Sequence, residues 1–189
     1  DFYLLKNNLR VLDMLNVKYI VDLNESGNIE LKINEDVMGS AWFVDEVQKV
    51  TDSNQELLGL SSIDYKKTCL STNLNNKTYP DSSENYIEIV DKRANQITYK
   101  VSSNDTGFVV FSEAFYKNGW VAKMNGEVTD IHKVNDLLRG LEVEGGEHEI
   151  VFTFEPNVIK TGTLLMASSN ILLLILVFFY FRNLIKNVR

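Results

Sequence analysis

The chain has 189 residues, enough for one domain of ordinary size and a short additional segment. None of its 26 acidic residues follows Glu155, so residues 1–155 carry 15 basic against 26 acidic residues, a net charge of −11 that argues against binding of nucleic acid. A single cysteine, Cys69, excludes an intramolecular disulfide, and with only two histidines the sequence contains no zinc-binding cluster, so we expect no metal and no cofactor.

The N-terminal part predicts a short helix followed by strands. Leucines recur at helical spacing over residues 1–15, and a strand rich in β-branched and aromatic residues follows at 17–21. A turn at 24–28 leads into an alternating strand at 29–33, and residues 41–50 are typical of one further strand.

A second short helix and a polar loop follow. Ser53 is placed to cap a helix that ends at Gly59, with Glu56 three residues beyond the cap. Residues 70–85 are rich in Ser, Asn and Thr and contain Pro80, so we expect an exposed loop.

The second half predicts a series of short strands. Three candidates, separated by polar turns, lie at 86–90, 96–102 and 107–112. Asn125-Gly126 between strands at 121–124 and 127–131 suits a type I′ turn, which needs positive φ at both positions. A four-residue loop at 144–147 predicts a second hairpin, between strands at 137–143 and 148–154. The predicted fold class is mainly β, a sandwich or jelly-roll-like domain with a short N-terminal helix.

A transmembrane helix is predicted after this domain. Residues 161–181 form a run of 21 residues without a charge, and a helix of that length spans about 31 Å, close to the ~30 Å hydrocarbon core of a bilayer. A buried core helix is the alternative, but such helices seldom run this long without a polar face. Arg182, Lys186 and Arg189 follow the run, whereas only Lys160 lies close on the other side, so the positive-inside rule places the C-terminus in the cytoplasm.

These observations predict two parts: a β-rich domain outside the membrane at 1–157, and a transmembrane helix with a short basic cytoplasmic tail at 158–189. Because the chain begins with Asp1 and has no signal sequence, we expect a fragment that lacks a signal peptide or upstream membrane helices. Asn170, a polar residue inside the apolar run, predicts packing against other helices of a multi-pass bundle, or else is a tolerated polar residue in a lone anchor.

Several stretches together resemble a known family. They are SEAFYKNGW at 112–120, Asn125-Gly126, Asn135, Arg139-Gly140, Gly145, His148, residues 152–156 before the final helix, and the stretches at 10–20 and 39–44. This combination is similar to the C-terminal region of YfhO-like bacterial membrane proteins. Asn125 stands where that family more often has Asp, and Asp136 where an aromatic residue is commoner.

The resemblance implies a large multi-pass protein related to glycosyltransferases that use lipid-linked sugars and act on cell-envelope polymers. The catalytic carboxylates expected for the family lie in a loop near its N-terminal membrane region, outside this chain. No catalytic residue is therefore carried over.

Aromatic residues are the candidate binding residues. Tyr116 and Trp120, with Phe115, could stack on a sugar face, and Trp42 is a similar candidate; the alternative for all of them is packing in the core. His132, near Asp130 and Asn135, is a possible polar cluster or else a solvated histidine.

Three functions are compatible with this pattern. The first is the accessory domain of a membrane glycosyltransferase-like protein of the bacterial cytoplasmic membrane, which positions an acceptor or a partner near the bilayer. Its partners would be the lipid bilayer, upstream transmembrane helices, and an envelope polysaccharide or lipid-linked sugar. The alternatives are a non-catalytic polysaccharide-binding module on a membrane anchor and a scaffold for other envelope proteins.

Overall fold

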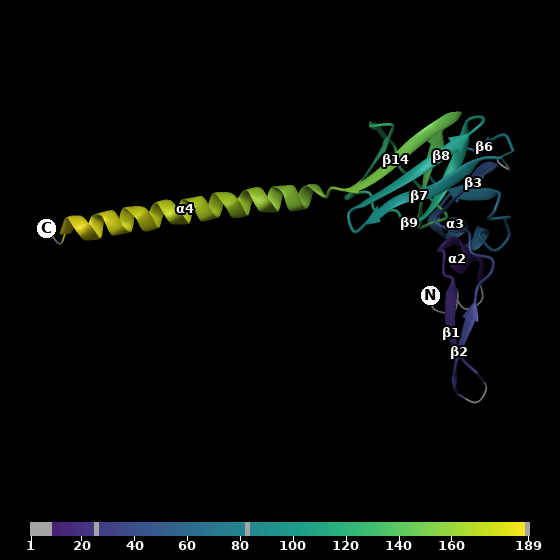
Figure 1. The fold of residues 1–189 in the computed structure, drawn as a ribbon, viewed down its shortest axis with the longest axis horizontal. Coiled ribbons are helices and arrows are strands. Elements are labelled where there is room, and N and C mark those ends of the chain that lie inside the picture. The colour runs from purple at the N-terminus through teal and green to yellow at the C-terminus, as the bar shows by residue number, and fades with distance from the viewer. Residues whose placement is uncertain (1–8, 25–26, 82–83, 188–189) are drawn as a thin grey trace.

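The computed structural model describes residues 9–24, 27–81 and 84–187 of the chain. A β-rich body carries a long helix that extends from one end, and a two-stranded arm projects downward from the part of the body farther from this helix (Figure 1). The predicted fold class, mainly β with one C-terminal apolar helix, is confirmed.

The body is built around a β-sandwich of two antiparallel sheets. The first contains, in spatial order, β11 (Glu127–Thr129), β10 (Trp120–Met124), β14 (Gly146–Phe154), β8 (Gln96–Ser103) and β7 (Tyr86–Arg93). The second contains β12 (His132–Val134), β13 (Leu138–Val143), β9 (Gly107–Ala114) and β3 (Ala41–Val44). Between the sheets the rings of Tyr99, Phe111 and Phe152 pack edge to face with centroids 4.9–6.0 Å apart, the favoured aromatic geometry.

A third layer covers the outer face of the four-stranded sheet. It consists of β5 (Thr68–Ser71), β4 (Glu46–Lys49) and β6 (Lys77–Thr78), with α3 (Ser53–Gly59) between β4 and β5. Strand β9 is consequently buried on both faces: Phe108 and Val110 pack against this layer, whereas Val109 and Phe111 point into the sandwich. This double burial explains why β9 reads as a continuous apolar run without alternation.

The N-terminal elements form the arm and its base. Helix α2 (Leu9–Met14) lies at the base, and strands β1 (Tyr19–Leu23) and β2 (Ile29–Ile33) form an antiparallel hairpin that pairs with no other strand of the described residues. Residues 1–8 of the predicted first helix lie outside the described residues.

Helix α4 (Asn157–Asn187) follows the last strand almost directly. Its apolar part, Asn157–Tyr180, has 24 residues and a length of about 36 Å, and none of it is buried by the body. It is the one helix among the described residues that is long and apolar enough to cross a bilayer, and it begins four residues before the predicted 161–181 core.

The two predicted hairpins have different outcomes. Asn125 and Gly126 have φ of 52° and 89° and join paired strands β10 and β11, so the type I′ prediction is confirmed. The second prediction is wrong, because β13 pairs with β9 and β12 while β14 pairs with β8 and β10. The connection at 144–145 crosses from one sheet to the other, and a glycine-rich connection permits either geometry.

Three further predictions need correction. Residues 41–50 form two strands in different sheets, because the chain bends at Asp45, whose amide donates to the Lys67 carbonyl at 2.7 Å. The predicted exposed loop at 70–85 begins inside a fully buried strand, β5, and contains the short strand β6. The N-cap of α3 is Asp52 and not Ser53, since Asp52 Oδ1 accepts from the Gln55 amide at 2.9 Å.

The double burial of β9 predicts that both of its faces contribute to stability. Phe108→Ala and Phe111→Ala should each lower the free energy of unfolding by about 3–5 kcal/mol, because each leaves a cavity in a different core. Val128→Ala is the control, since Val128 is 72% exposed. Urea unfolding of the full chain in detergent measures the difference, and a small effect at Phe108 would contradict the three-layer arrangement.

Candidate functional site

The loop between β9 and β10 lies against the end of the last strand. The Glu155 amide donates to the Gly119 carbonyl at 2.6 Å, and a Cβ on Gly119 would lie only 2.2 Å from the Phe154 ring. Only glycine therefore allows the loop to approach this closely. The contact joins the loop to the segment that leads directly into α4.

Two aromatic side chains of this loop stand over Phe154. The ring centroids of Trp120 and Tyr116 lie 5.2 Å and 6.3 Å from that of Phe154. Trp120 is half-buried, whereas Tyr116 is 55% exposed. The structure thus brings together two of the three predicted stacking residues.

A hollow of about 300 Å³ opens beside them, which we name the aromatic hollow. It is lined by Phe115, Tyr116, Lys117, Trp120, Val121, Ala122, Val128, Thr129, Asp130 and Ile131. A second hollow of about 380 Å³ lies on the side of Trp120 toward α4, where Lys117, Glu155 and Lys160 contribute to its lining. Trp120 is therefore shared by two depressions at the junction of the body and the membrane helix.

A buried cation fixes Trp120. The guanidinium of Arg139, a residue that is 2% exposed, lies 4.2 Å from the centroid of the Trp120 ring and 5.2 Å from that of Phe152. Arg139 Nε donates to the Ala114 carbonyl at 2.9 Å, whereas Nη1 has no hydrogen-bond partner among the described residues. Burial lowers the pKa of Arg139, and the cation–π contact offsets part of the cost of desolvation.

Arg139 is the site residue that sequence reasoning missed. A charged residue between Leu138 and Gly140 is compatible with a solvent-facing position on a strand, and only the packing of the two sheets shows that it is buried. Arg139 shares the inward face of β13 with Leu141 and Val143, and the register of β13 against β9 shifts between Leu138 and Arg139.

The third predicted stacking residue lies elsewhere. Trp42 is 7% exposed in the core between the four-stranded sheet and the outer layer, where its Nε1 donates to the Tyr65 carbonyl at 3.2 Å. Phe43 points to the opposite face, as expected for the next residue on a strand. Trp42 packs in the interior and has no ring face open to a sugar.

The predicted polar cluster does not assemble. Asn135 is buried, and its Oδ1 accepts from the Leu70 amide at 2.9 Å. Asp130 lines the aromatic hollow, whereas His132 lines a smaller hollow of about 160 Å³ together with Glu142 and Tyr79. Among the described residues, no group of three His, Cys, Asp or Glu side chains could hold a metal ion.

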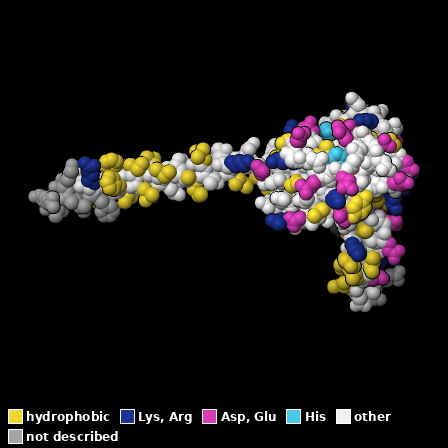
Figure 2. All heavy atoms as spheres, turned by 45° about the horizontal axis from the view of Figure 1, so that its top comes forward, with side chains coloured by type: hydrophobic (Ala, Val, Ile, Leu, Met, Phe, Trp, Pro, Cys, Tyr) yellow, Lys and Arg dark blue, Asp and Glu magenta, His cyan; other side chains and the backbone are white. Residues whose placement is uncertain are grey.

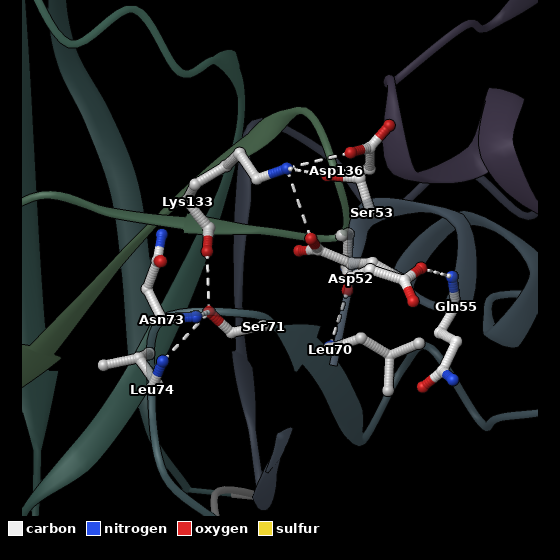
Figure 3. A network of polar contacts seen from close by, with 11 residues as sticks. Asp52, Ser53, Gln55, Leu70, Ser71, Asn73, Leu74, Lys133 and Asp136 are labelled. Carbon is white, nitrogen blue, oxygen red and sulfur yellow. Dashed lines mark hydrogen bonds and ion pairs between the residues drawn. The ribbon is translucent and has the colours of Figure 1, made fainter. Parts of the chain in front are cut away.

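An ion-pair network around the buried carboxylate of Glu56 lies on the other side of the four-stranded sheet (Figure 3). Lys133 Nζ lies 3.2 Å from Oε2 of Glu56, which is fully buried, and 2.8 Å from Oδ1 of Asp136. It also donates to the Ser53 hydroxyl at 3.2 Å. Asp136 and Asn135 both have positive φ, which aims the carboxylate of Asp136 back toward Lys133. The network joins α3 to β12.

Asn170 lies midway along the apolar part of α4. The side-chain amide of Asn170 makes no hydrogen bond with another described residue. The hydroxyls of the neighbouring Ser168 and Ser169 both donate to the Leu165 carbonyl at 2.8 Å. The serines are satisfied within their own helix. Packing of Asn170 against other helices stays a prediction.

The fold and the helix together define a membrane protein whose β-sandwich domain sits directly on an apolar helix. The family model described as "Bacterial membrane protein YfhO" matches residues 69–166, slightly more than half of the chain. The chain therefore belongs to the YfhO family of bacterial membrane proteins, as the resemblance predicted. No curated protein and no solved structure matches it.

The ion-pair network predicts a pH dependence of stability. Burial raises the pKa of Glu56, and the Asp136 amide and the Lys133 ammonium offset this only in part. The folded state thus holds the proton more tightly than the unfolded state, so the free energy of unfolding should fall as pH rises above about 4.5 through the raised pKa. Glu56→Gln should flatten this slope in urea unfolding of the full chain between pH 4 and 8.

Glu142 provides the matched control. Burial alone would raise its pKa, but hydrogen bonds from Lys77 and Tyr79 outweigh this effect and lower the pKa. Its contribution to stability is lost as pH falls below about 4.5, so Glu142→Gln should leave the slope at higher pH unchanged. An unchanged slope in Glu56→Gln would contradict the assignment to Glu56.

Proposed function

We propose that this chain is the C-terminal accessory domain and last helix of a membrane glycosyltransferase-like protein that glycosylates cell-envelope polymers. In this proposal the aromatic hollow binds a sugar of the acceptor polymer or of the lipid-linked donor. The observation that carries it is the position of the hollow: its aromatic residues stand on the segment that leads into the membrane helix.

The composition of the hollow supports a carbohydrate. The exposed ring of Tyr116 and the half-buried ring of Trp120 offer apolar faces of the kind that pack on sugar rings. Lys117, Thr129 and Asp130 add hydrogen-bonding groups at the rim. A volume of about 300 Å³ lies at the lower end of the range for small-molecule sites.

The chemistry of transfer is assigned to other parts of the parent protein. Asp130 is the one carboxylate that lines the aromatic hollow within the described part of the chain, and general acid–base catalysis by a carboxylate pair needs two. Positioning is therefore the role proposed here. The same hollow would also serve the alternative function, a polysaccharide-binding module that is anchored in the membrane without an associated transferase.

The short connection to α4 gives positioning a physical basis. Only Pro156 separates Glu155 from the first residue of α4, and Glu155 Oε2 accepts from Lys160 Nζ at 2.8 Å. A helix held this way keeps the hollow near the bilayer surface, where a lipid-linked sugar is presented. The basic residues after the helix favour a cytoplasmic C-terminus and hence an extracytoplasmic body.

A substitution at the exposed ring tests the site. Tyr116→Ala should weaken glycan binding about 5–10-fold, because one aromatic stacking contact is worth about 1 kcal/mol. Binding of the full chain in nanodiscs to an array of bacterial envelope glycans measures the change. The control is Tyr86→Ala, since Tyr86 is similarly exposed, at 50%, but lies on β7 away from the hollow.

Two further results complete this test. Trp120→Phe, which keeps an aromatic ring over Arg139, should weaken the same interaction. In the parent protein, Tyr116→Ala should lower glycosylation of the envelope polymer if the domain positions a substrate. If the domain is an independent binding module, glycosylation should be unchanged. Equal binding by the wild type and both variants would refute the hollow as a glycan site.

Sidedness is tested by labelling in intact cells. A cysteine in the exposed β8–β9 turn, Asp105→Cys, should react with a membrane-impermeant maleimide. Asn183→Cys, in α4 beyond its apolar part, should react only after permeabilisation. Cys69 gives little background because it is completely buried. The reverse labelling pattern would place the body in the cytoplasm and refute the proposed function.

A further inference from the structure

The arm formed by β1 and β2 has one apolar face against which no other described element packs. Three directly opposed cross-strand pairs share this face: Tyr19 with Ile33, Val21 with Leu31, and Leu23 with Ile29. All six side chains are between 56% and 77% exposed. Hydrophobic side chains accordingly gather along the projecting arm in Figure 2.

The opposite face of the arm is suited to water. Lys32 Nζ lies 3.5 Å from Asp22 Oδ2 and 3.6 Å from Glu30 Oε2, and all three side chains are about half exposed. The hairpin thus has one apolar and one polar face, the pattern of an antiparallel sheet that is packed on one face and solvated on the other. Because a two-stranded hairpin is marginally stable in water, packing of its exposed apolar face against another surface would stabilise it.

The arm is held firmly at its base. The buried carboxylate of Asp13 accepts from Asn34 Nδ2 at 2.7 Å and from the Tyr65 hydroxyl at 2.7 Å. Asn34 Nδ2 also donates to the Val17 carbonyl at 3.1 Å, and the Asn34 amide donates to the Lys18 carbonyl at 2.8 Å. These bonds tie both ends of the hairpin to α2 and to the outer layer, so the apolar face is presented in a fixed direction.

We propose that this face binds the same face of a second copy of the chain, with the two arms stacked as a small four-stranded sandwich about a two-fold axis. The central pair, Val21 and Leu31, would then lie at the centre of the interface. Stacked sheets of this kind lie about 10 Å apart, with interdigitated side chains.

The area of the face fits a dimer. A buried apolar side chain removes roughly 60–120 Å² of apolar surface from water, so six that are about two-thirds exposed supply roughly 240–480 Å² per copy. Because about 65% of a homodimer interface is apolar, the two copies would bury roughly 700–1,500 Å² in total. This range includes the ~1,000 Å² expected of a specific interface.

Charge and geometry favour a second copy over the membrane. The six side chains of the apolar face are uncharged, although the Lys18 ammonium lies 5.9 Å from the centroid of the Tyr19 ring at one end of the face. Two copies therefore meet at the central pair without opposing like charges, although each body up to Glu155 has a net charge of −11. The arm also lies on the side of the body away from α4, in both views of the molecule (Figures 1 and 2). A bilayer that holds α4 is therefore remote from this face.

Two neighbouring residues on β2 provide a matched test. Sedimentation equilibrium of the full chain in a density-matched detergent should show a reversible dimer, which Leu31→Ser weakens at least tenfold and Lys32→Ser leaves within twofold. These residues are adjacent on one strand but face opposite sides. A chain that stays monomeric at about 100 µM, or a dimer that Leu31→Ser does not weaken, overturns the proposal.

A crosslinking measurement avoids dependence on a destabilised arm. Val21→Cys should give a disulfide-linked dimer under mild oxidation, whereas Asp22→Cys, on the opposite face, should stay reduced; the buried Cys69 does not interfere. Equal crosslinking at both positions refutes a face-to-face arrangement. If the chain is a monomer, and Leu31→Ser abolishes its binding to another envelope protein or to lipid vesicles, the face belongs to that partner. This result also refutes the dimer.

Discussion

The burial of one sheet on both faces is the constraint on which the rest of the structure depends. Strand β9 lies at the centre of this sheet, between β13 and β3, and sends Phe108 and Val110 to one core and Val109 and Phe111 to the other. Every backbone polar group of such a strand must be paired within the sheet, because water reaches neither face. The four-stranded sheet therefore acts as the middle layer to which both outer layers are fixed.

The geometry of the aromatic hollow follows from this middle layer. The end of β9 supplies the Ala114 carbonyl that holds Arg139, and Arg139 in turn supports the ring of Trp120. From the other sheet, Phe154 at the end of β14 packs against Gly119 and under both aromatic rings. The hollow is thus built where strands from the two sheets end together, and rigid elements determine how its aromatic residues stand.

Local sequence signals predicted the elements whose structure is determined locally. Asn125-Gly126 fixes its own turn, and the uncharged run after Lys160 specifies a helix regardless of the body. By contrast, residues 144–147 have the chemistry of a hairpin turn, yet the two flanking strands do not pair with each other: β13 pairs with β12 and β9, and β14 pairs with β8 and β10. Strand β5 was not predicted for the same reason, because its short sequence at 68–71 precedes a polar loop and is buried only by tertiary packing.

The sequence identified Tyr116 and Trp120 as aromatic residues around a turn. Trp42 is also aromatic but lies in the core, and sequence alone does not separate the two environments.

Two cations mark the boundaries of the middle layer, Arg139, which is buried, and Lys133, which is partly buried. Arg139 faces the five-stranded sheet, and Lys133 reaches Glu56 of α3 in the outer layer. Apolar residues of similar volume could fill both positions at no loss of stability, because desolvation of a buried charge offsets most of its electrostatic gain. Apolar residues would not supply directional hydrogen bonds. The bond from Arg139 Nε to the Ala114 carbonyl lies where the register of β13 shifts, between Leu138 and Arg139. The Lys133 contacts lie beside Asn135 and Asp136, the two residues with positive φ. We interpret the two cations as determinants of strand register, because β9 is apolar on both faces and a one-residue slip would still bury apolar side chains. Because the register of β13 sets the position of Arg139 under Trp120, the same polar contacts that specify the fold also specify the shape of the hollow.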